Sequence, residues 1–406
     1  MIKAESAAVN SELGIISASL GEAIRQAADE IVRGEMADQF PVDVFQTGSG
    51  TSTNMNMNEV IANRAAEILG EPVHPNDHVN ASQSSNDTFP SAGRVAAVVQ
   101  LTTTLLPALQ SLLASLLDLS NRHEATVKMA RTHLMDAVPM TFGQEVGGWA
   151  RGVELSCQRI DAMLPRLAEL PLGGTAVGTG LNAPRRFGSM VAKRLSGRTT
   201  QAFTEASNHF EAQSSQDAMV EAGATLKVVA LSLNKIAGDL RLLGSGPNGG
   251  LGEIILPALQ AGSSIMPGKV NPVIPEMVQQ VAAQVVGNDT TMTFAATMST
   301  LQLSTAMPIT ARSLLSSIHL LANAASLLDA KCIRGVEVDR ERMRRNAERS
   351  PAIVTALAPR IGYDAATKLV HQAEEQGVSL AELIEQQDVG ASPIGDALLA
   401  MTRPAD

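Results

Sequence analysis

The sequence predicts an all-α protein assembled from long, closely packed helices. Hydrophobic residues make up 45% of the 406 residues, but aromatic residues make up only 2%. Alanine, leucine, valine and methionine must therefore fill the core, and such side chains suit bundled helices better than a β-sandwich. Five stretches repeat apolar residues at the helical period, several of them on more than one face. They are residues 91–118, 144–164, 215–243, 275–293 and 305–328.

We expect the chain to divide into three domains. The first forty residues have a helical pattern, whereas residues 46–87 are rich in Gly, Ser, Thr, Asn, Pro and His around one short helix at 59–69. From about Asp339 the sequence becomes more charged and its apolar period shortens. The expected domains are an N-terminal domain of helices and loops, a central bundle of five helices and a small helical C-terminal domain. Their boundaries are 1–85, 86–340 and 341–406.

Composition and charge exclude several classes of protein. With a net charge of −10 and a sequence pI of about 5.3, the chain lacks the basic character that nucleic-acid binding requires. An acidic chain can still bind an acidic metabolite where cations and N–H donors gather in one cleft. Cys157 and Cys332 match no metal-binding spacing, so both are expected to be reduced thiols in the core of a cytoplasmic protein.

Neither a signal peptide nor a membrane span is predicted. The first six residues, Met-Ile-Lys-Ala-Glu-Ser, contain no apolar run of the kind that a signal peptide needs. The most apolar stretch, residues 95–119, is interrupted by Gln100, Pro107, Gln110 and three threonines. We therefore interpret it as a buried bundle helix and expect no membrane partner.

The loop Gly262-Ser-Ser-Ile-Met-Pro-Gly-Lys-Val-Asn271 is the most informative part of the chain. It places two hydroxyls, an ammonium group, an amide and two flexible glycines within ten residues. A helix is expected to begin near Pro272 or Pro275, so that its positive dipole end faces the same space. Such a loop suits a carboxylate whose negative charge grows during a reaction, although an ordinary glycine-rich connector has a similar composition.

Further polar clusters lie at the ends of the expected helices. They are Gln46-Thr-Gly-Ser-Gly-Thr-Ser-Thr-Asn54, His74-Pro-Asn-Asp77, Gln83-Ser-Ser-Asn-Asp87, Arg131-Thr-His-Leu-Met-Asp136 and Leu172-Gly-Gly-Thr-Ala-Val-Gly-Thr-Gly-Leu-Asn182. Ser, Thr and Asn side chains donate hydrogen bonds to carboxylates, so the clusters suit a small dicarboxylate. His133, expected at a helix start, pairs naturally with Glu276 as a general base.

The same clusters lack the signatures of metal and nucleotide sites. His74 and His78 are four residues apart, but Pro75 opposes a continuous helix there and no third ligand follows. Residues 48–51 lack the lysine of a phosphate loop, and the glycines at 173–180 have no βαβ context. We expect neither a metal nor an organic cofactor.

In the order and spacing of these motifs the chain resembles the fumarase/aspartase superfamily, and most closely the class II fumarate hydratases. The resemblance extends over essentially the whole chain. It implies an all-helical subunit of three domains, whose central five-helix bundles join into the twenty-helix core of a homotetramer. It also implies active sites shared among three subunits, which explains why the clusters are so far apart along the chain.

The resemblance also implies a role for each residue of the opening loop. Ser263 matches the serine that removes the Cβ proton of L-malate, and Ser264 helps to hold the substrate. Lys269, Val270 and Asn271 match the segment that binds the carboxylate which becomes a dianionic aci-acid. Because an unperturbed serine is a very weak acid, its oxyanion must be stabilised by N–H groups, a helix N-terminus and Lys269.

The remaining roles fall on the other clusters. Two short strips of residues, named at the end of this paragraph, match segments that donate hydrogen bonds to the substrate carboxylates in the family. One further motif matches the second anion site of the family, which lies outside the catalytic pocket. Thr132 and His133 match the pair that handles water, and Glu276 matches the carboxylate that orients the histidine. The reaction implied is the reversible trans hydration of fumarate to L-malate. The donor strips are Ser49, Gly50 and Thr51, and Ser84, Ser85 and Asn86; the second anion site is His74, Pro75, Asn76 and Asp77.

Two alternatives remain open. Residues 273–276, 287–291 and 301–303 resemble aspartate ammonia-lyases, but His133, Ser85 and Gly268 stand where those enzymes carry Gln, Thr and Ala. A non-catalytic relative that keeps the fold is the second alternative. The chain is expected to lack a leading segment of the family, and Ser304 stands where relatives carry Asn. Each departure is expected to lower stability or activity without altering the fold. The expected lack of the leading segment keeps the second alternative open, whereas the complete set of catalytic residues opposes it.

Overall fold

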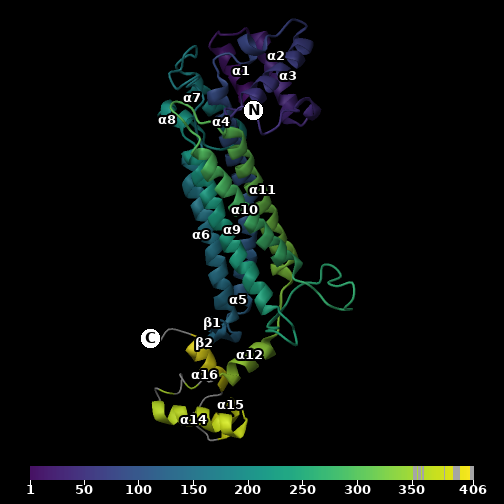
Figure 1. Ribbon diagram of the computed structural model, residues 1–406, viewed down its shortest axis with the longest axis vertical. Coiled ribbons are helices and arrows are strands. Elements are labelled where there is room, and N and C mark those ends of the chain that lie inside the picture. Colours follow the sequence, from purple (N-terminus) through teal and green to yellow (C-terminus); the bar gives the residue numbers. More distant parts are fainter. Residues whose placement is uncertain (351–353, 355–357, 359–360, 379, 387–393, 403–406) are drawn as a thin grey trace. The chain divides into compact units, whose positions relative to one another are not determined.

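The computed structural model describes residues 1–350, 354, 358, 361–378, 380–386 and 394–402, and it is predominantly helical, as predicted (Figure 1). The helices are α1 Ile2–Glu12, α2 Ala18–Val32, α3 Thr51–Leu69, α4 Ser85–Gln100, α5 Leu106–Arg122, α6 Phe142–Leu167, α7 Phe187–Thr199, α8 His209–Ser214, α9 Asp217–Leu243, α10 Val273–Ala296, α11 Met307–Lys331, α12 Arg340–Arg349, α14 Tyr363–Gln376, α15 Leu380–Gln386 and α16 Ile394–Met401. Short 3-10 or π turns are η1 Ala37–Gln39, η2 Pro75–Val79, η3 Leu101–Leu105 and η4 Ile333–Gly335.

Strands are few and short. Within the described residues they form three two-stranded sheets, of which only the β1–β2 hairpin is longer than two residues per strand. The strands are β1 Val127–Thr132, β2 Met135–Thr141, β3 Glu169–Leu170, β4 Thr204–Glu205, β5 Ile254–Ile255 and β6 Glu337–Val338. The prediction of an all-α protein is confirmed.

Each of the five predicted long helices is present, with ends that differ from the prediction by a few residues. The first of them runs from α4 through η3 into α5, as an unbroken helix over Ser85–Arg122. Its π turn ends two residues before Pro107, whose ring nitrogen carries no hydrogen for the usual helical bond. By length and composition alone this helix could cross a membrane, but half of its most apolar window is buried inside the structure.

The chain divides into two compact units. The first unit comprises residues 1–107, 156–231 and 281–323, and the second comprises residues 108–155, 232–280 and 324–406. Within the first unit, α1 packs against α2 and α7, while α3 packs against α2, η2 and α4. Their shared core is made of small and branched side chains, including Ala4, Ile24, Ala27, Ile61 and Ala65. The three-domain boundaries given by the sequence stay a prediction.

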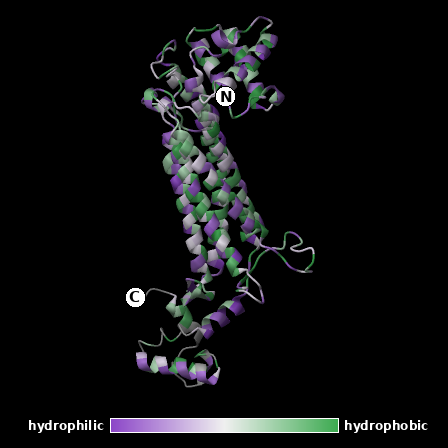
Figure 2. Ribbon diagram, in the orientation of Figure 1, coloured by the Kyte–Doolittle hydropathy of each residue, from purple (hydrophilic) through white to green (hydrophobic). Residues whose placement is uncertain are grey.

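The second unit contains the β1–β2 hairpin and residues 108–122 of α5. Leu109, Leu112, Leu116 and Leu119 of α5 recur three or four residues apart and are completely buried, as one apolar stripe of a helix should be. Leu117 between them is exposed. Figure 2 shows hydrophobic and hydrophilic residues interleaved along the long helices.

Candidate active site

The first donor strip lies at the N-terminus of α3, in the first unit. Gly50 caps this helix in the left-handed conformation, with φ of 73°, and a Cβ atom there would meet the ring of Phe89 at 2.3 Å. Ser49 Oγ and Thr51 Oγ1 are hydrogen-bonded at 2.9 Å on either side of it. The backbone thus brings two hydroxyls beside the start of a helix, where Gln46 Oε1 already caps the Thr53 N–H, and helix starts of this kind suit carboxylates.

The second donor strip begins α4, which packs against α3 in the same unit. Ser84 is the N-cap, and its Oγ accepts a hydrogen bond from the Asn86 N–H at 3.2 Å. Asp87 completes a capping box, because its Oδ1 accepts the Ser84 N–H at 2.9 Å. The first unit therefore holds two helix N-termini that carry the predicted donors, with hydroxyls at the start of α3 and hydroxyls and an amide at the start of α4.

Asp87 joins the second strip to the glycine loop 172–182. Its Oδ2 accepts the backbone N–H groups of Gly173 at 3.1 Å and of Thr175 at 2.9 Å. Asn86 Nδ2 donates to the Ala176 carbonyl at 2.9 Å, so the loop is held from two side chains. Burial raises the pKa of the Asp87 carboxyl to about 6, against the opposing effect of these hydrogen bonds. Sequence reasoning missed this role, although the capping pattern Ser84-x-x-Asp87 was visible.

The predicted second anion site forms the π turn η2. His74 caps this turn, and its Nδ1 accepts N–H bonds from Asn76 at 3.3 Å and from Asp77 at 3.0 Å. The Asp77 carboxylate lies 3.3 Å from the same Nδ1. These side chains are exposed.

His133 lies in a hairpin turn of the second unit, and the expectation that it begins a helix was wrong. Thr132 ends β1 and pairs with Met135, so His133 and Leu134 form the two-residue turn between the strands. Both have positive φ, 56° and 62°, as a tight turn of this kind requires. The helix α6 begins only at Phe142. His133 and Thr132 are both exposed.

A buried group of charges anchors this hairpin. Glu253 is completely buried, and its Oε1 accepts a hydrogen bond from Arg131 at 2.6 Å. Lys128 Nζ lies 3.2 Å from Glu253 Oε2 and 2.5 Å from Glu145 Oε2. Burial opposes ionisation of Glu253, but Arg131, Lys128 and Asn346 outweigh it and lower the pKa of this carboxyl. No motif in the sequence pointed to Glu253 as a functional or structural residue.

The loop that carries Ser263 folds back on itself in the second unit. Asn271 Nδ2 donates to the Gly262 carbonyl at 2.6 Å and closes the loop. A Cβ atom at Gly262 would meet the Lys269 carbonyl oxygen at 2.0 Å, so only glycine fits there. Ser263 Oγ accepts the backbone N–H groups of Ile265 at 3.2 Å and of Met266 at 3.0 Å. Two N–H donors thus point at Ser263 Oγ, and they would stabilise a negative charge on this oxygen.

Glu276 lies in the first turn of α10, where its Oε1 is 3.5 Å from Arg241 NH2. In the described part of a single chain no hydrogen bond joins Glu276 to His133, nor His133 to the Ser263 loop. The predicted residues therefore divide between the units. The first unit holds both donor strips and the second anion site, and the second unit holds Thr132, His133, the Ser263 loop and Glu276.

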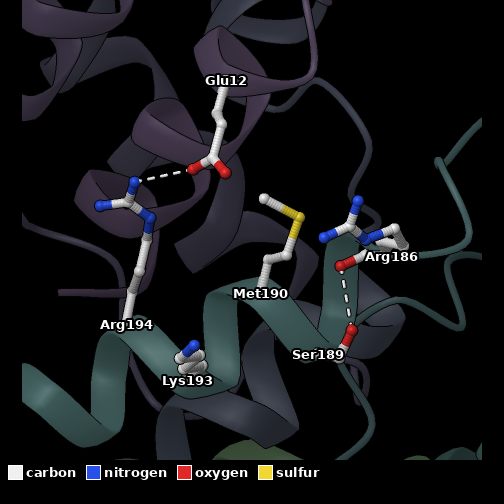
Figure 3. A pocket seen from close by; sticks show the side chains of 6 residues that line it. All are labelled: Glu12, Arg186, Ser189, Met190, Lys193 and Arg194. Atoms are coloured by element: carbon white, nitrogen blue, oxygen red, sulfur yellow. Dashed lines mark hydrogen bonds and ion pairs between the residues drawn. The ribbon is translucent and has the colours of Figure 1, made fainter.

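One hollow of the first unit contains none of the predicted residues. It has a volume of about 480 Å³ and is lined by the six residues in Figure 3. An ion pair of 2.9 Å between Arg194 and Glu12 links α7 to α1 beside it, and Ser189 Oγ donates to the Arg186 carbonyl at 3.1 Å. Its cationic side chains are exposed, as on an ordinary solvated helix face.

Comparison with known proteins agrees with the motifs. Residues 1–287 match the family described as Lyase, and residues 353–392 match the one described as Fumarase C C-terminus. The class II fumarate hydratase of Corynebacterium efficiens is 50% identical over 386 residues, which are 95% of this chain and 81% of that protein. That of Mycobacterium tuberculosis is 50% identical over 399 residues, which are 98% of this chain and 83% of that protein.

Solved structures share the fold. The class II fumarase of Schistosoma mansoni superimposes with a TM-score of 0.92 at 36% identity, covering 99% of this chain and 88% of that one. The fumarate lyase:delta crystallin of Brucella melitensis superimposes with a TM-score of 0.94 at 42% identity, and the match covers 100% of this chain and 89% of that one. The chain therefore belongs to the lyase family of the fumarase/aspartase superfamily and, within it, to the class II fumarate hydratases. The resemblance inferred from the motifs is confirmed.

Proposed function

We propose that the protein is a hydro-lyase that interconverts fumarate and L-malate, with Ser263 as the base that removes the Cβ proton. The single observation that carries the role of Ser263 is the pair of backbone N–H groups, from Ile265 and Met266, donated to its Oγ. They stabilise the alkoxide relative to the hydroxyl, as an oxyanion hole stabilises developing charge. Lys269 on the same loop adds a positive charge.

The substrate carboxylates are the groups that the donor strips would hold. Removing the C–H proton of malate drives negative charge onto the adjacent carboxylate, and groups that bind this aci-carboxylate lower the barrier. We assign that carboxylate to Lys269, Val270, Asn271 and the adjoining Ser264. The helix N-termini of α3 and α4, with Ser49 to Thr51 and Ser84 to Asn86, supply neutral donors for the substrate.

We assign the binding of the reacting water to the hairpin turn between β1 and β2. Thr132 and His133 would hold the departing or attacking water on the face of the substrate opposite Ser263, which gives trans stereochemistry. An exposed imidazole can exchange protons near neutral pH, which suits water chemistry. Glu276 is assigned to orient this histidine. No metal or organic cofactor takes part in the proposed reaction.

We further propose that the protein is a cytoplasmic homotetramer in which each active site collects residues from three subunits. In one chain His133 makes no hydrogen bond to Glu276, so their pairing calls for a second chain. The long helices also expose large apolar side chains, as helices at an assembly interface do. They include Leu117, Leu231, Leu242, Phe294 and Leu327. The second anion site at His74 to Asp77 is proposed to bind a dicarboxylate through the His74 Nε2–H and the neighbouring donors.

The decisive test is an assay of the purified protein. Fumarate absorbs in the ultraviolet, so malate-dependent growth of this absorption measures the proposed reaction directly. Aspartate is tested alongside, because an ammonia-lyase would generate the same absorption from aspartate instead. Absorption from neither substrate would favour a non-catalytic relative. Chelator-treated protein should retain its activity with malate.

A further inference from the structure

The two donor strips of the first unit are joined by one buried amide, that of Asn54. This residue lies one helical turn after Thr51 on α3 and is only 6% exposed. Its Nδ2 donates to Ser85 Oγ at 2.9 Å, across 31 residues of sequence. Ser85 is the first residue of α4 and belongs to the second donor strip.

The hydrogen bond from Asn54 decides what the Ser85 hydroxyl can do. A serine hydroxyl has one hydrogen to donate and two lone pairs that accept. Because Asn54 fills a lone pair, the Ser85 hydrogen is not drawn towards the protein interior at this contact. The Ser85 hydroxyl hydrogen therefore stays available for an acceptor outside the protein interior. In the proposed reaction this acceptor is a substrate carboxylate.

A network behind Asn54 fixes the orientation of its amide. The second Nδ2 hydrogen of Asn54 donates to Asn80 Oδ1 at 3.2 Å. Asn80 Oδ1 also accepts from Lys3 Nζ at 2.9 Å and from Asn58 Nδ2 at 3.2 Å. Lys3 Nζ can only donate, so this atom of Asn80 is an acceptor, and the Asn54 amide presents its NH₂ end to both Asn80 and Ser85. The Asn54 carbonyl oxygen is buried on the other side without a hydrogen-bond partner.

We infer that Asn54 is a positioning residue for substrate binding, which holds Ser85 as a hydrogen-bond donor by occupying its acceptor side. Asn54 itself does not touch the substrate. The inference rests on the proposed function, because it assumes that Ser85 donates to a substrate carboxylate. It predicts that the chemistry of position 54, and not only its size, sets the affinity for the dicarboxylate.

The test compares two replacements of Asn54. In Asn54→Asp the side chain keeps its shape but becomes an acceptor, so it captures the Ser85 hydrogen and removes it from the substrate. In Asn54→Ala the hydroxyl loses a partner but keeps its hydrogen free. We expect Asn54→Asp to raise the KM for L-malate about ten- to a hundred-fold, as the loss of one hydrogen bond to a charged group does. Asn54→Ala should raise it much less, whereas a purely structural role predicts the larger defect from truncation.

Asn58→Asp is the matched control. Asn58 follows one turn later on α3, is 1% exposed, and donates to the same Asn80 oxygen at the same distance of 3.2 Å, but it has no hydrogen bond to Ser85. The substitution Asn58→Asp therefore introduces an equal charge into the same network without changing the hydrogen bonds of the Ser85 hydroxyl. We expect its KM to stay within a few-fold of the unmodified protein. Thermal unfolding of all variants shows whether they are folded.

Double variants with Ser85→Ala complete the experiment. If Asn54 acts through Ser85, Asn54→Asp should add no more to the KM in the Ser85→Ala background than Asn58→Asp does. Full multiplication of the two effects, or equal effects of Asn54→Asp and Asn58→Asp, would overturn the inference. If Asn54→Asp does not fold, the same cycle is run with Asn54→Ala, whose smaller effect must vanish in the Ser85→Ala background.

The failure of the inference can be told from the failure of the proposed function. An unchanged KM in Ser85→Ala alone would remove the substrate-binding role of Ser85, and the inference with it, while the hydratase activity stands. Absence of malate and fumarate interconversion in the unmodified protein would overturn the proposed function itself.

Discussion

Glu253 and Arg131 are joined by a hydrogen-bonded ion pair of 2.6 Å, although 122 residues separate them and Glu253 is completely buried. The pair ties the segment that leads into Thr132 and His133 to the strand β5, which begins at the next residue, Ile254. Asn346 of α12 donates to the same carboxylate oxygen at 3.0 Å. Three segments of the second unit therefore meet at one side chain.

Glu253→Gln should destabilise the protein strongly. The change leaves the cations of Lys128 and Arg131 with less negative charge in a buried site, and breaking a buried pair in this way costs about 3–5 kcal/mol. We expect a matching fall in the free energy of unfolding, measured with urea, and lower turnover as the His133 hairpin loosens. Glu337→Gln, at an exposed position of β6, is the control and should change stability by less than about 0.5 kcal/mol.

The same carboxylate makes stability depend on pH. The pKa of Glu253 is lowered in the folded state, so its contribution to stability is present above its ordinary value of 4.5. As pH falls below that value, the unfolded state binds a proton that the folded state resists, and stability is lost. Urea unfolding between pH 6 and pH 3 should show a decline below about pH 4.5 that is shallower in Glu253→Gln. Parallel declines in the two proteins would show that Glu253 is not responsible.

Ser263→Ala and His133→Asn should each lose most of the turnover, by about 10²- to 10⁴-fold, while the assembly persists. Both side chains are partly or fully exposed and neither supports a core, so folding should be preserved. Initial rates with malate and the mass of the particle by light scattering check both statements. A Ser263→Ala protein that keeps its activity would contradict the role of Ser263 as the base.

Mixing the two inactive variants should restore activity if active sites are shared. After subunits of Ser263→Ala and His133→Asn are exchanged, some sites in a mixed tetramer contain both intact residues. We expect a fraction of the unmodified rate to return, and neither variant alone should give it after the same treatment. Failure to regain activity, with exchange shown by mass, would mean that Ser263 and His133 of each site come from one subunit.

Gly50→Ala should be much more harmful than Gly70→Ala, although both glycines have nearly the same left-handed conformation, with φ of 73° and 75°. A Cβ atom at Gly70 meets nothing within 4 Å, so alanine there carries only the conformational cost of about 1–2 kcal/mol. At Gly50 it meets the Phe89 ring at 2.3 Å, which adds about 1–3 kcal/mol and displaces the first donor strip. Thermal unfolding and the KM for malate measure both effects, and equal losses would contradict the steric argument.

Much of the fold was predictable because its signals are local. The apolar period and the shortage of aromatic residues predicted the long helices, and their ends were misplaced by a few residues. The hairpin over residues 127–141 was missed, since its strands are short and Arg131 and Asp136 make them look like a polar loop. The glycine at position 50 was recognised as part of a donor strip, but the Phe89 ring that requires it was not visible.

The sequence by itself determined the helices and the polar clusters at their ends, because both depend on residues within a few turns of one another. Only the tertiary structure decided which clusters meet within each unit. Asn54 reaches Ser85 across 31 residues, Asp87 reaches Thr175 across 88, and Arg131 reaches Glu253 across 122. Such pairings depend on packing and on the need to satisfy every buried polar group, and no local pattern of residues specifies them.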